Sequence, residues 1–259
     1  MEKTFALLAV LASIGSVQAA DLPARKSAQA PALAASQWGG LYWGWGLSGV
    51  QGDALEGRGH WWDVNGTYET IGTDGRNRAV AGEMHLGYNF QRNRIVYGLE
   101  LQATVSALDV KGISARYDVT NTTVSDRLLS YTRTPLSASL LGRMGYTFDQ
   151  AFVYVAAGPS VAQVVRKVFQ ADDGRGYQWL AAGASNSFNK TSLGWSAGAG
   201  VDYKLSGSLS ARAQYLFTYL GSQKYNYLGY PFGILDQGTQ KVRTYQSAVT
   251  VGLSYALGN

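Results

Sequence analysis

The chain has 259 residues, enough for one large or two small domains, and a net charge of +5. Its 32 glycines, 17 tyrosines and low charged fraction of 15% fit neither a disordered chain nor a helical bundle and favour an all-β barrel. The absence of cysteine excludes disulfides, cysteine-based zinc sites and thiol nucleophiles, and no basic run indicates a nucleic-acid partner.

The N-terminal segment, residues 1–19, has the pattern of a secretory signal peptide. Lys3 precedes an apolar stretch at residues 5–14, and small residues follow it up to Val17-Gln18-Ala19. The apolar stretch is too short to cross a bilayer as a helix, which takes about 20 residues. Residues 20–37, rich in alanine, proline, serine and glutamine, are predicted to be a flexible lead. The folded domain is expected over residues 38–259.

From residue 38 onward, eight segments alternate between apolar and polar residues, the period of a β-strand with two different faces. In the second segment, Met84 and Leu86 fall on one face and Glu83 and His85 on the other. The fifth segment is apolar on both faces, so its inward face is left open. The segments cover residues 38–50, 80–90, 97–106, 136–148, 152–164, 195–204, 209–217 and 249–257.

The connections between these segments alternate in length. Tight turns are expected at residues 91–94, 149–150 and 206–208, and long polar stretches lie near 52–77, 108–133, 166–190 and 221–244. Short periplasmic turns and long extracellular loops are typical of outer-membrane barrels. The predicted fold is therefore an all-β, eight-stranded antiparallel transmembrane β-barrel with four long extracellular loops and both termini in the periplasm.

Side-chain size decides which face of the barrel points outward. A soluble, lipocalin-like barrel would carry many long lysine and glutamate side chains outside, whereas the polar face here is mostly glycine, serine, alanine and threonine, which suits a narrow interior. The apolar face ends in aromatic residues beside the tight turns, as a membrane-interface girdle does. The residues of this girdle are Tyr88, Phe90, Tyr97, Tyr146, Phe148, Tyr203 and Tyr255.

Two stretches carry a resemblance to a known family. The segment Ala20-Asp21-Leu22-Pro23 and the entry to the first strand, Trp38-Gly39-Gly40-Leu41-Tyr42, resemble the small outer-membrane β-barrel family of alphaproteobacteria. That family has an OmpA-type membrane domain and includes porin-like, opacity-like and haemin-binding surface proteins. The resemblance implies outer-membrane lipid and lipopolysaccharide as neighbours, and periplasmic chaperones and the barrel-assembly machinery as partners. The family usually ends on an aromatic residue, whereas this chain ends Leu257-Gly258-Asn259.

The inward face of the predicted strands carries several charged residues. An unpaired charge inside a narrow barrel costs several kcal/mol, so these residues are expected to form ion pairs that plug the lumen. A narrow pore whose charges set ion preference is the alternative. The predicted ion-pair residues are Glu83, Glu100, Arg143, Asp202, Lys204 and Arg212.

Enzymatic activity is not expected. The chain has two histidines, and His85 is predicted inside the barrel, away from lipid or peptide substrates. A Gly-x-Gly-x-x-Gly match at residues 44–49 lies in a strand with no helix after it, so it lacks the context of a nucleotide site. The leading hypothesis is a structural, surface-exposed barrel that contributes to envelope integrity. A narrow porin-like channel and a haemin receptor are the alternatives.

The haemin hypothesis rests on His60, the one histidine predicted in a loop, and on the neighbouring Trp61 and Trp62. Histidine is a common axial ligand of haem iron, and indole rings could stack on the porphyrin. The acidic residues of the first loop would repel the haem propionates. Basic residues of the third and fourth loops, such as Arg166 and Lys190 of the third, would have to form ion pairs with the propionates instead. The fourth loop also holds four aromatic residues that could form a contact patch or an outer girdle, namely Tyr225, Tyr227, Tyr230 and Phe232.

If His60 binds haem, titrating haemin into the detergent-solubilised protein shifts the Soret band, and His60→Ala abolishes the shift. An identical shift in both proteins removes His60 as the ligand, and no shift in either contradicts haem binding altogether.

Overall fold

The computed structural model describes residues 37–63, 66–72, 75–118, 124–171, 177–178, 187–229 and 236–257. The predicted signal peptide and residues 20–36 of the predicted lead lie outside these ranges. Within them the secondary structure is β, and no helix is long and apolar enough to cross a membrane. The strands are β1 Gly40–Asp63, β2 Gly66–Gly72, β3 Gly75–Arg92, β4 Ile95–Ser106, β5 Asp109–Asp118, β6 Val124–Phe148, β7 Ala151–Ala171, β8 Tyr177–Gln178, β9 Ser187–Lys204, β10 Leu209–Gly229 and β11 Asp236–Ala256.

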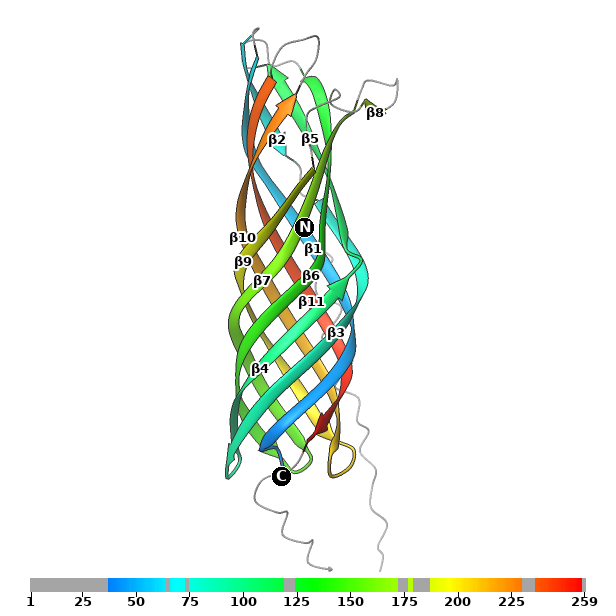
Figure 1. Ribbon diagram of the computed structural model, residues 1–259, viewed down its shortest axis with the longest axis vertical. Helices are drawn as coiled ribbons and strands as arrows, with labels where there is room; N and C mark the ends of the chain where they lie inside the picture. Colours follow the sequence, from blue (N-terminus) through cyan, green and yellow to red (C-terminus); the bar gives the residue numbers. More distant parts are fainter. Residues whose placement is uncertain are drawn as a thin grey trace, which may run out of the picture. The chain divides into compact units, whose positions relative to one another are not determined.

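Eight of these strands close into a ring in the order β1-β3-β4-β6-β7-β9-β10-β11, with β11 pairing back to β1 and every pair antiparallel. Toward one end, β2 and β5 replace β3 and β4 between β1 and β6. Figure 1 shows β2, β5 and β8 gathered at that end. The predicted eight-stranded antiparallel barrel is confirmed, with two of its strands interrupted.

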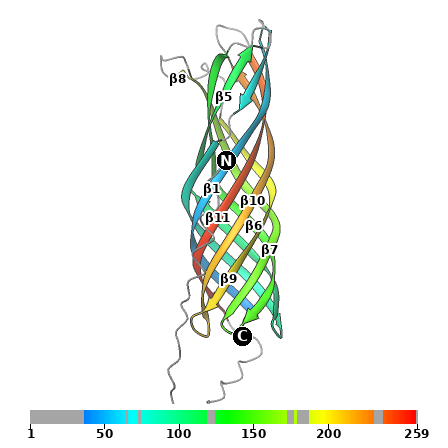
Figure 2. The ribbon, with the colours of Figure 1, turned by 180° about the vertical axis from the view of Figure 1, so that it is seen from behind.

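Tight turns join the strands at the other end, which we call the turn end; the end with β2, β5 and β8 is the loop end (Figures 1 and 2). Asn93 and Asp149 adopt positive φ values of 56° and 47° in two of these turns. Asparagine and aspartate tolerate this left-handed conformation better than other non-glycine residues. The three short connections predicted from the sequence thus lie together.

An apolar band encircles the turn-end half of the barrel on the outside. In β3 inward and outward positions alternate, and the outward residues from Val80 to Phe90 include side chains 47–71% exposed. A water-facing surface rarely carries so continuous an apolar belt. Eleven residues of a tilted strand span roughly 25 Å, the height of the lipid-facing band of outer-membrane barrels. The apolar band covers residues 41–47, 80–90, 95–105, 136–148, 153–161, 193–203 and 249–257, with Tyr215 of β10.

The structure settles the face of the fifth predicted segment, now β7. Phe152, Tyr154 and Ala156 are buried in the lumen, while Val153 and Val155 are exposed. The inward aromatic rings pack against Trp38 and Arg143, partners that come from distant parts of the sequence. The hydropathy of the segment alone could not predict these contacts, so it could not show which face of β7 points inward.

Much of each predicted long loop is β-strand. β1 continues to Asp63, sixteen residues or roughly 40 Å of tilted strand past the apolar band. Beyond the band the pattern changes: several inward positions become apolar, as at Val50, Ala54 and Val110, and most outward positions become polar. Beyond the band the outward face does not contact lipid and carries polar residues, so the sequence of these strand segments resembles that of polar loops.

Two irregularities shift the alternation within strands. The register between β6 and β7 slips between Arg133 and Leu136, around Pro135, which has no N–H to donate. The register between β10 and β11 slips between Tyr219 and Ser222, where Gly221 has a φ of 78° that favours glycine.

The topology can be tested by cysteine labelling of a chain that has no native cysteine. With a membrane-impermeant maleimide on intact cells, Lys167→Cys at the loop end should be labelled and Gly207→Cys at the turn end should not. Lysed cells, in which both sites react, provide the control. Labelling of Gly207→Cys but not of Lys167→Cys in intact cells would invert the topology.

Candidate functional site

The lumen near the turn end holds a charged cluster made by five strands. Tyr42 of β1, Glu100 of β4, Arg143 of β6, Asp202 of β9 and Arg212 of β10 all occupy inward positions and are buried. We call these five residues the charged cluster. Four of them are among the predicted ion-pair residues, and they come together because the ring brings inward positions of different strands to one height.

Each arginine of the charged cluster bridges both carboxylates. Arg143 donates to Glu100 Oε2 and to Asp202 Oδ2, both at 2.8 Å. Arg212 reaches Asp202 Oδ1 and Glu100 Oε2, both at 2.9 Å. Tyr42 accepts a hydrogen bond from Arg143 and donates one to Glu100 at 2.7 Å. Two positive and two negative groups cancel, which is the condition for keeping charges in a buried site.

Glycines make room for the aromatic members of this layer. Tyr42, Gly87 and Glu100 lie on one rung across β1, β3 and β4, and a Cβ atom at Gly87 would lie 2.3 Å from the Tyr42 hydroxyl. Tyr154 lies across Gly200 in the same way, with its ring centroid 3.8 Å from the Arg143 guanidinium carbon. The inward glycines therefore let large side chains cross the lumen.

Trp38 closes the lumen on the turn-end side of the charged cluster. It is 6% exposed, packs on Phe152 with ring centroids 5.5 Å apart, and its backbone N–H donates to Gln91 at 2.8 Å. Lys204, predicted as an ion-pair residue, is placed differently. Its Nζ lies 4.8 Å from the Trp38 ring centroid and donates to the Gly207 carbonyl at 3.3 Å. Because the strand ends at Lys204, its long side chain reaches the mouth of the lumen instead of an acidic partner.

Glu83, also predicted as an ion-pair residue, contacts a histidine instead of an arginine. His85 Nδ1 lies 3.1 Å from Glu83, and its Nε2 lies 2.8 Å from the Ser254 hydroxyl. The order serine, histidine, carboxylate resembles a nucleophilic triad. The side chains of Glu83 and His85 are fully buried, however, so a substrate cannot approach them. The arrangement satisfies buried polar groups.

A belt of hydroxyl groups lines the middle of the lumen. Ser160 and Ser196 lie 2.6 Å apart, Ser196 and Thr218 2.7 Å, and Ser139 and Ser160 2.8 Å. On the other side, the hydroxyls of Ser48 and Thr250 lie 2.7 Å apart. These hydroxyl contacts join neighbouring strands and line the wall of the lumen, and at the same height Gln214 of β10 donates to Gln102 of β4 across the lumen at 3.4 Å.

A second buried ion pair, which the sequence did not predict, lies toward the loop end. Arg166 Nη2 contacts Glu56 at 2.6 Å and Gln240 at 3.2 Å, and its Nη1 contacts Thr132 at 3.1 Å. Ser130 also donates to Glu56. Both charged residues had been assigned to loops, and Arg166 to haem propionates; this assignment is wrong because both side chains face the lumen. Continuing the alternation of the first segment by three steps from Val50 would have placed Glu56 inside.

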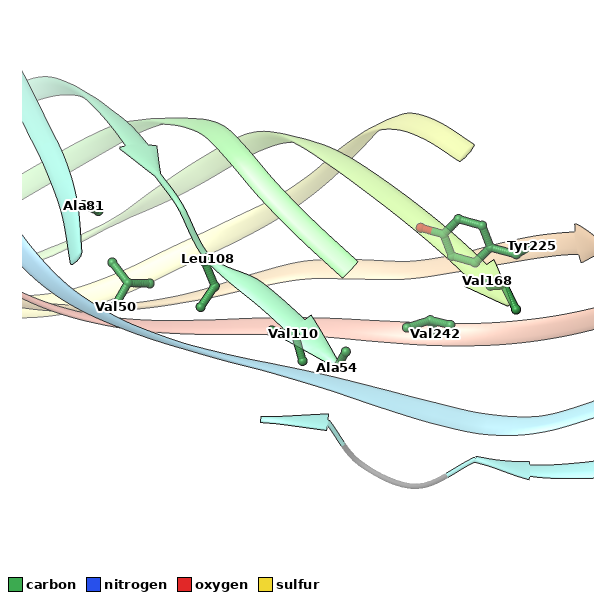
Figure 3. Packing of buried hydrophobic residues seen from close by; sticks show 8 residues of the cluster. All are labelled: Val50, Ala54, Ala81, Leu108, Val110, Val168, Tyr225 and Val242. Carbon is green, nitrogen blue, oxygen red and sulfur yellow. The ribbon is translucent and has the colours of Figure 1, made fainter. Parts of the chain in front are cut away.

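An apolar layer also closes the lumen toward the loop end (Figure 3). Leu108 lies between β4 and β5, where the strand is interrupted, and packs so close to Gly52 that a Cβ atom there would lie 2.3 Å from it. Tyr225, predicted for a surface patch or girdle, is 1% exposed in this layer because the irregularity at Gly221 turns it inward. Burial raises the pKa of the Tyr225 phenol. The layer comprises Val50, Ala54, Ala81, Leu108, Val110, Val168, Tyr225 and Val242.

The haemin candidates lie in strand, not in a loop. The backbones of His60, Trp61 and Trp62 pair with both β2 and β11. Their side chains, and those of Tyr227, Tyr230 and Phe232, lie outside the described residues. In the part of the chain that is described, no group of three or more histidine, cysteine, aspartate or glutamate residues is arranged to hold a metal ion.

Comparisons with known proteins agree with this architecture. The family model described as "Outer membrane protein beta-barrel domain" matches residues 6–256. The "22 kDa outer membrane protein" of Rhizobium leguminosarum bv. viciae is 25% identical over 227 residues, which cover 87% of this chain and 81% of the relative. The "25 kDa outer-membrane immunogenic protein" of Brucella abortus biovar 1 (strain 9-941) is 26% identical over 145 residues, 55% of this chain and 53% of the relative.

Among solved structures, the outer membrane protein OprG from Pseudomonas aeruginosa is similar, with a TM-score of 0.49 and 13% sequence identity over 84% of this chain and 96% of that one.

Removing one member of the charged cluster should destabilise the barrel strongly. Arg143→Ala leaves Glu100 and Asp202 without a major partner, and we expect it to lower the free energy of unfolding by about 3–5 kcal/mol. The exposed Arg133, which pairs with Asp109, provides the matched control; Arg133→Ala should cost no more than about 1 kcal/mol. Denaturant unfolding in lipid vesicles measures both, and equal losses would show that the charged cluster does not stabilise the fold.

Proposed function

We propose, since the chain belongs to the outer membrane protein β-barrel domain family, that it serves as a structural, surface-exposed component of the outer membrane whose lumen is closed to solutes. In this role the barrel contributes to envelope integrity, with the turn end in the periplasm and the loop end outside.

The observation that carries this proposal is the filling of the lumen at successive heights. The charged cluster and the apolar layer join side chains from strands on different sides of the ring, and between them, at the height of the hydroxyl belt, Gln214 reaches Gln102 across the lumen. An eight-stranded barrel leaves an interior only wide enough for side chains to fill. A solute would have to displace all three layers in turn.

The charge distribution supports a plug over an ion pathway. Selective pores carry rings of like charge or of carbonyl groups that replace the hydration shell of the ion. Here each buried arginine lies against carboxylates, so the charged cluster has no excess charge to attract an ion of either sign. A narrow channel would need these pairs to separate.

Non-enzymatic function and the absence of a resident cofactor are part of the same proposal. The matched relatives carry outer-membrane protein names, not enzyme names. The buried serine–histidine–glutamate contact is closed to substrate, as described above. Haemin binding through His60 remains a prediction that no described side chain favours.

Conductance across a planar bilayer tests the closed lumen. The purified full-length protein should give no stable openings after insertion, because the three layers block the path. Gly207→Cys labelled from the turn-end compartment serves as the control that the barrel has inserted. Discrete, long-lived openings by the inserted protein would contradict the plug and favour the porin-like alternative.

A further inference from the structure

The outward surface just above the apolar band, on its loop-end side, is strongly basic. Among the described side chains, eight exposed cationic residues lie there, against two carboxylates, Asp53 and Asp109. Both carboxylates are already paired with arginines of this surface. The cationic residues are Arg76, Arg78, Lys111, Arg133, Lys167, Lys224, Lys241 and Arg243.

Below these charges lies a cluster of aromatic side chains on β9, β10 and β11. The ring centroids of Tyr219 and Tyr245 are 5.1 Å apart, those of Trp195 and Phe217 5.7 Å, and those of Phe217 and Tyr245 6.1 Å. Aromatic rings at the edge of an apolar band mark the depth at which lipid headgroups begin. The basic surface therefore begins at headgroup height.

Aromatic and basic residues meet at one hollow on the outside of the barrel, with a volume of about 560 Å³. It is lined by Asp53, Leu55, Arg76, Phe217 and Tyr245. Arg243 is the β11 partner of Leu55, and Arg78 lies two residues along β3 from Arg76 on the same outward face. Arg243 thus faces a lining residue at a Cβ distance of about 5 Å, and Arg78 is the next outward residue along β3 from the lining residue Arg76, so both arginines flank the hollow.

The arginines on β3 are held in place by side chains of β1. The Nε atom of Arg78 donates to Gln51 at 3.1 Å, and the Nε atom of Arg76 donates to Asp53. The contact through Nε fixes the plane of the Arg78 guanidinium group, whose terminal N–H donors form a fork that matches phosphate oxygens. The geometry thus provides an oriented anion-binding edge beside an aromatic surface.

We propose that this hollow binds the phosphorylated disaccharide headgroup of an outer-leaflet glycolipid, the lipid A part of lipopolysaccharide. Arg78 and Arg243 bind phosphate, Phe217 and Tyr245 pack on the sugar rings, and the acyl chains lie along the apolar band. The glycolipid is favoured over a soluble anion because the hollow combines a cationic upper edge with an aromatic floor at headgroup height. The inference rests on the proposed location and orientation of the barrel, not on its closed lumen. The conductance experiment can therefore contradict the closed lumen without contradicting lipid binding, and the reverse also holds.

Native mass spectrometry of the detergent-solubilised full chain tests this site. The probes are bisphosphorylated lipid A, its monophosphorylated form and phosphatidylglycerol. We expect the order of affinity to follow the phosphate count of the two glycolipids, with phosphatidylglycerol weakest. The double variant Arg78→Gln/Arg243→Gln should weaken binding of bisphosphorylated lipid A at least tenfold.

The matched control is Arg133→Gln/Lys167→Gln, which removes the same charge from β6 and β7, away from the hollow, and should weaken binding less than twofold. Circular dichroism verifies that both variants keep their β structure, as expected for outward-facing positions. Equal weakening by the two double variants would replace the site with a general attraction to the basic surface. Phosphatidylglycerol binding as tight as lipid A would overturn the glycolipid assignment.

Discussion

A ring of eight strands encloses so little space that every charge placed inside must find its partner within the ring. The charged cluster meets this constraint with two arginines and two carboxylates from four strands, and the Arg212–Glu100 and Arg143–Asp202 pairs join strands that are not neighbours in the ring. The inward glycines, the inward aromatic rings and the position of Trp38 all follow from it. They provide the room and the cover that keep these charges together and away from water.

The polarity pattern of the barrel differs between its two halves. Within the apolar band the outside is apolar and the lumen polar, as lipid requires. Beyond the band the outside carries charges, and the lumen holds apolar residues such as Val50, Leu108 and Val110 beside the buried Glu56–Arg166 pair. The same strands run through both halves, because the backbone geometry of a β-strand does not depend on whether its side chains are polar or apolar. Only the identity of the residues on each face changes at the membrane boundary.

The fold could be predicted from the sequence wherever lipid imposes a sharp contrast between the two faces. The eight strands, the tight turns and the inward positions of Glu100, Arg143, Asp202 and Arg212 follow from that contrast. The Glu56–Arg166 pair was missed because outside lipid the contrast between the faces weakens: the alternation of β1 continued from Val50 places Glu56 inside, but nothing local identifies Arg166 as its partner. The predicted surface location of Tyr225 is wrong because the hydropathy pattern does not reveal the irregularity at Gly221. The inward face of β7 could not be predicted because its inward aromatic rings pack against residues far away in the sequence.

The pairing of β1 with β11 also has a consequence for the timing of assembly. Tyr42 lies opposite Ala256, so the seam joins strands at opposite ends of the folded domain. Until the last strand arrives, β1 and its neighbours present an open edge and an apolar face to water, and contacts of such sequence separation form slowly. The chain therefore passes through a long-lived, aggregation-prone stage, and its yield depends on being held apart from other chains until the seam closes.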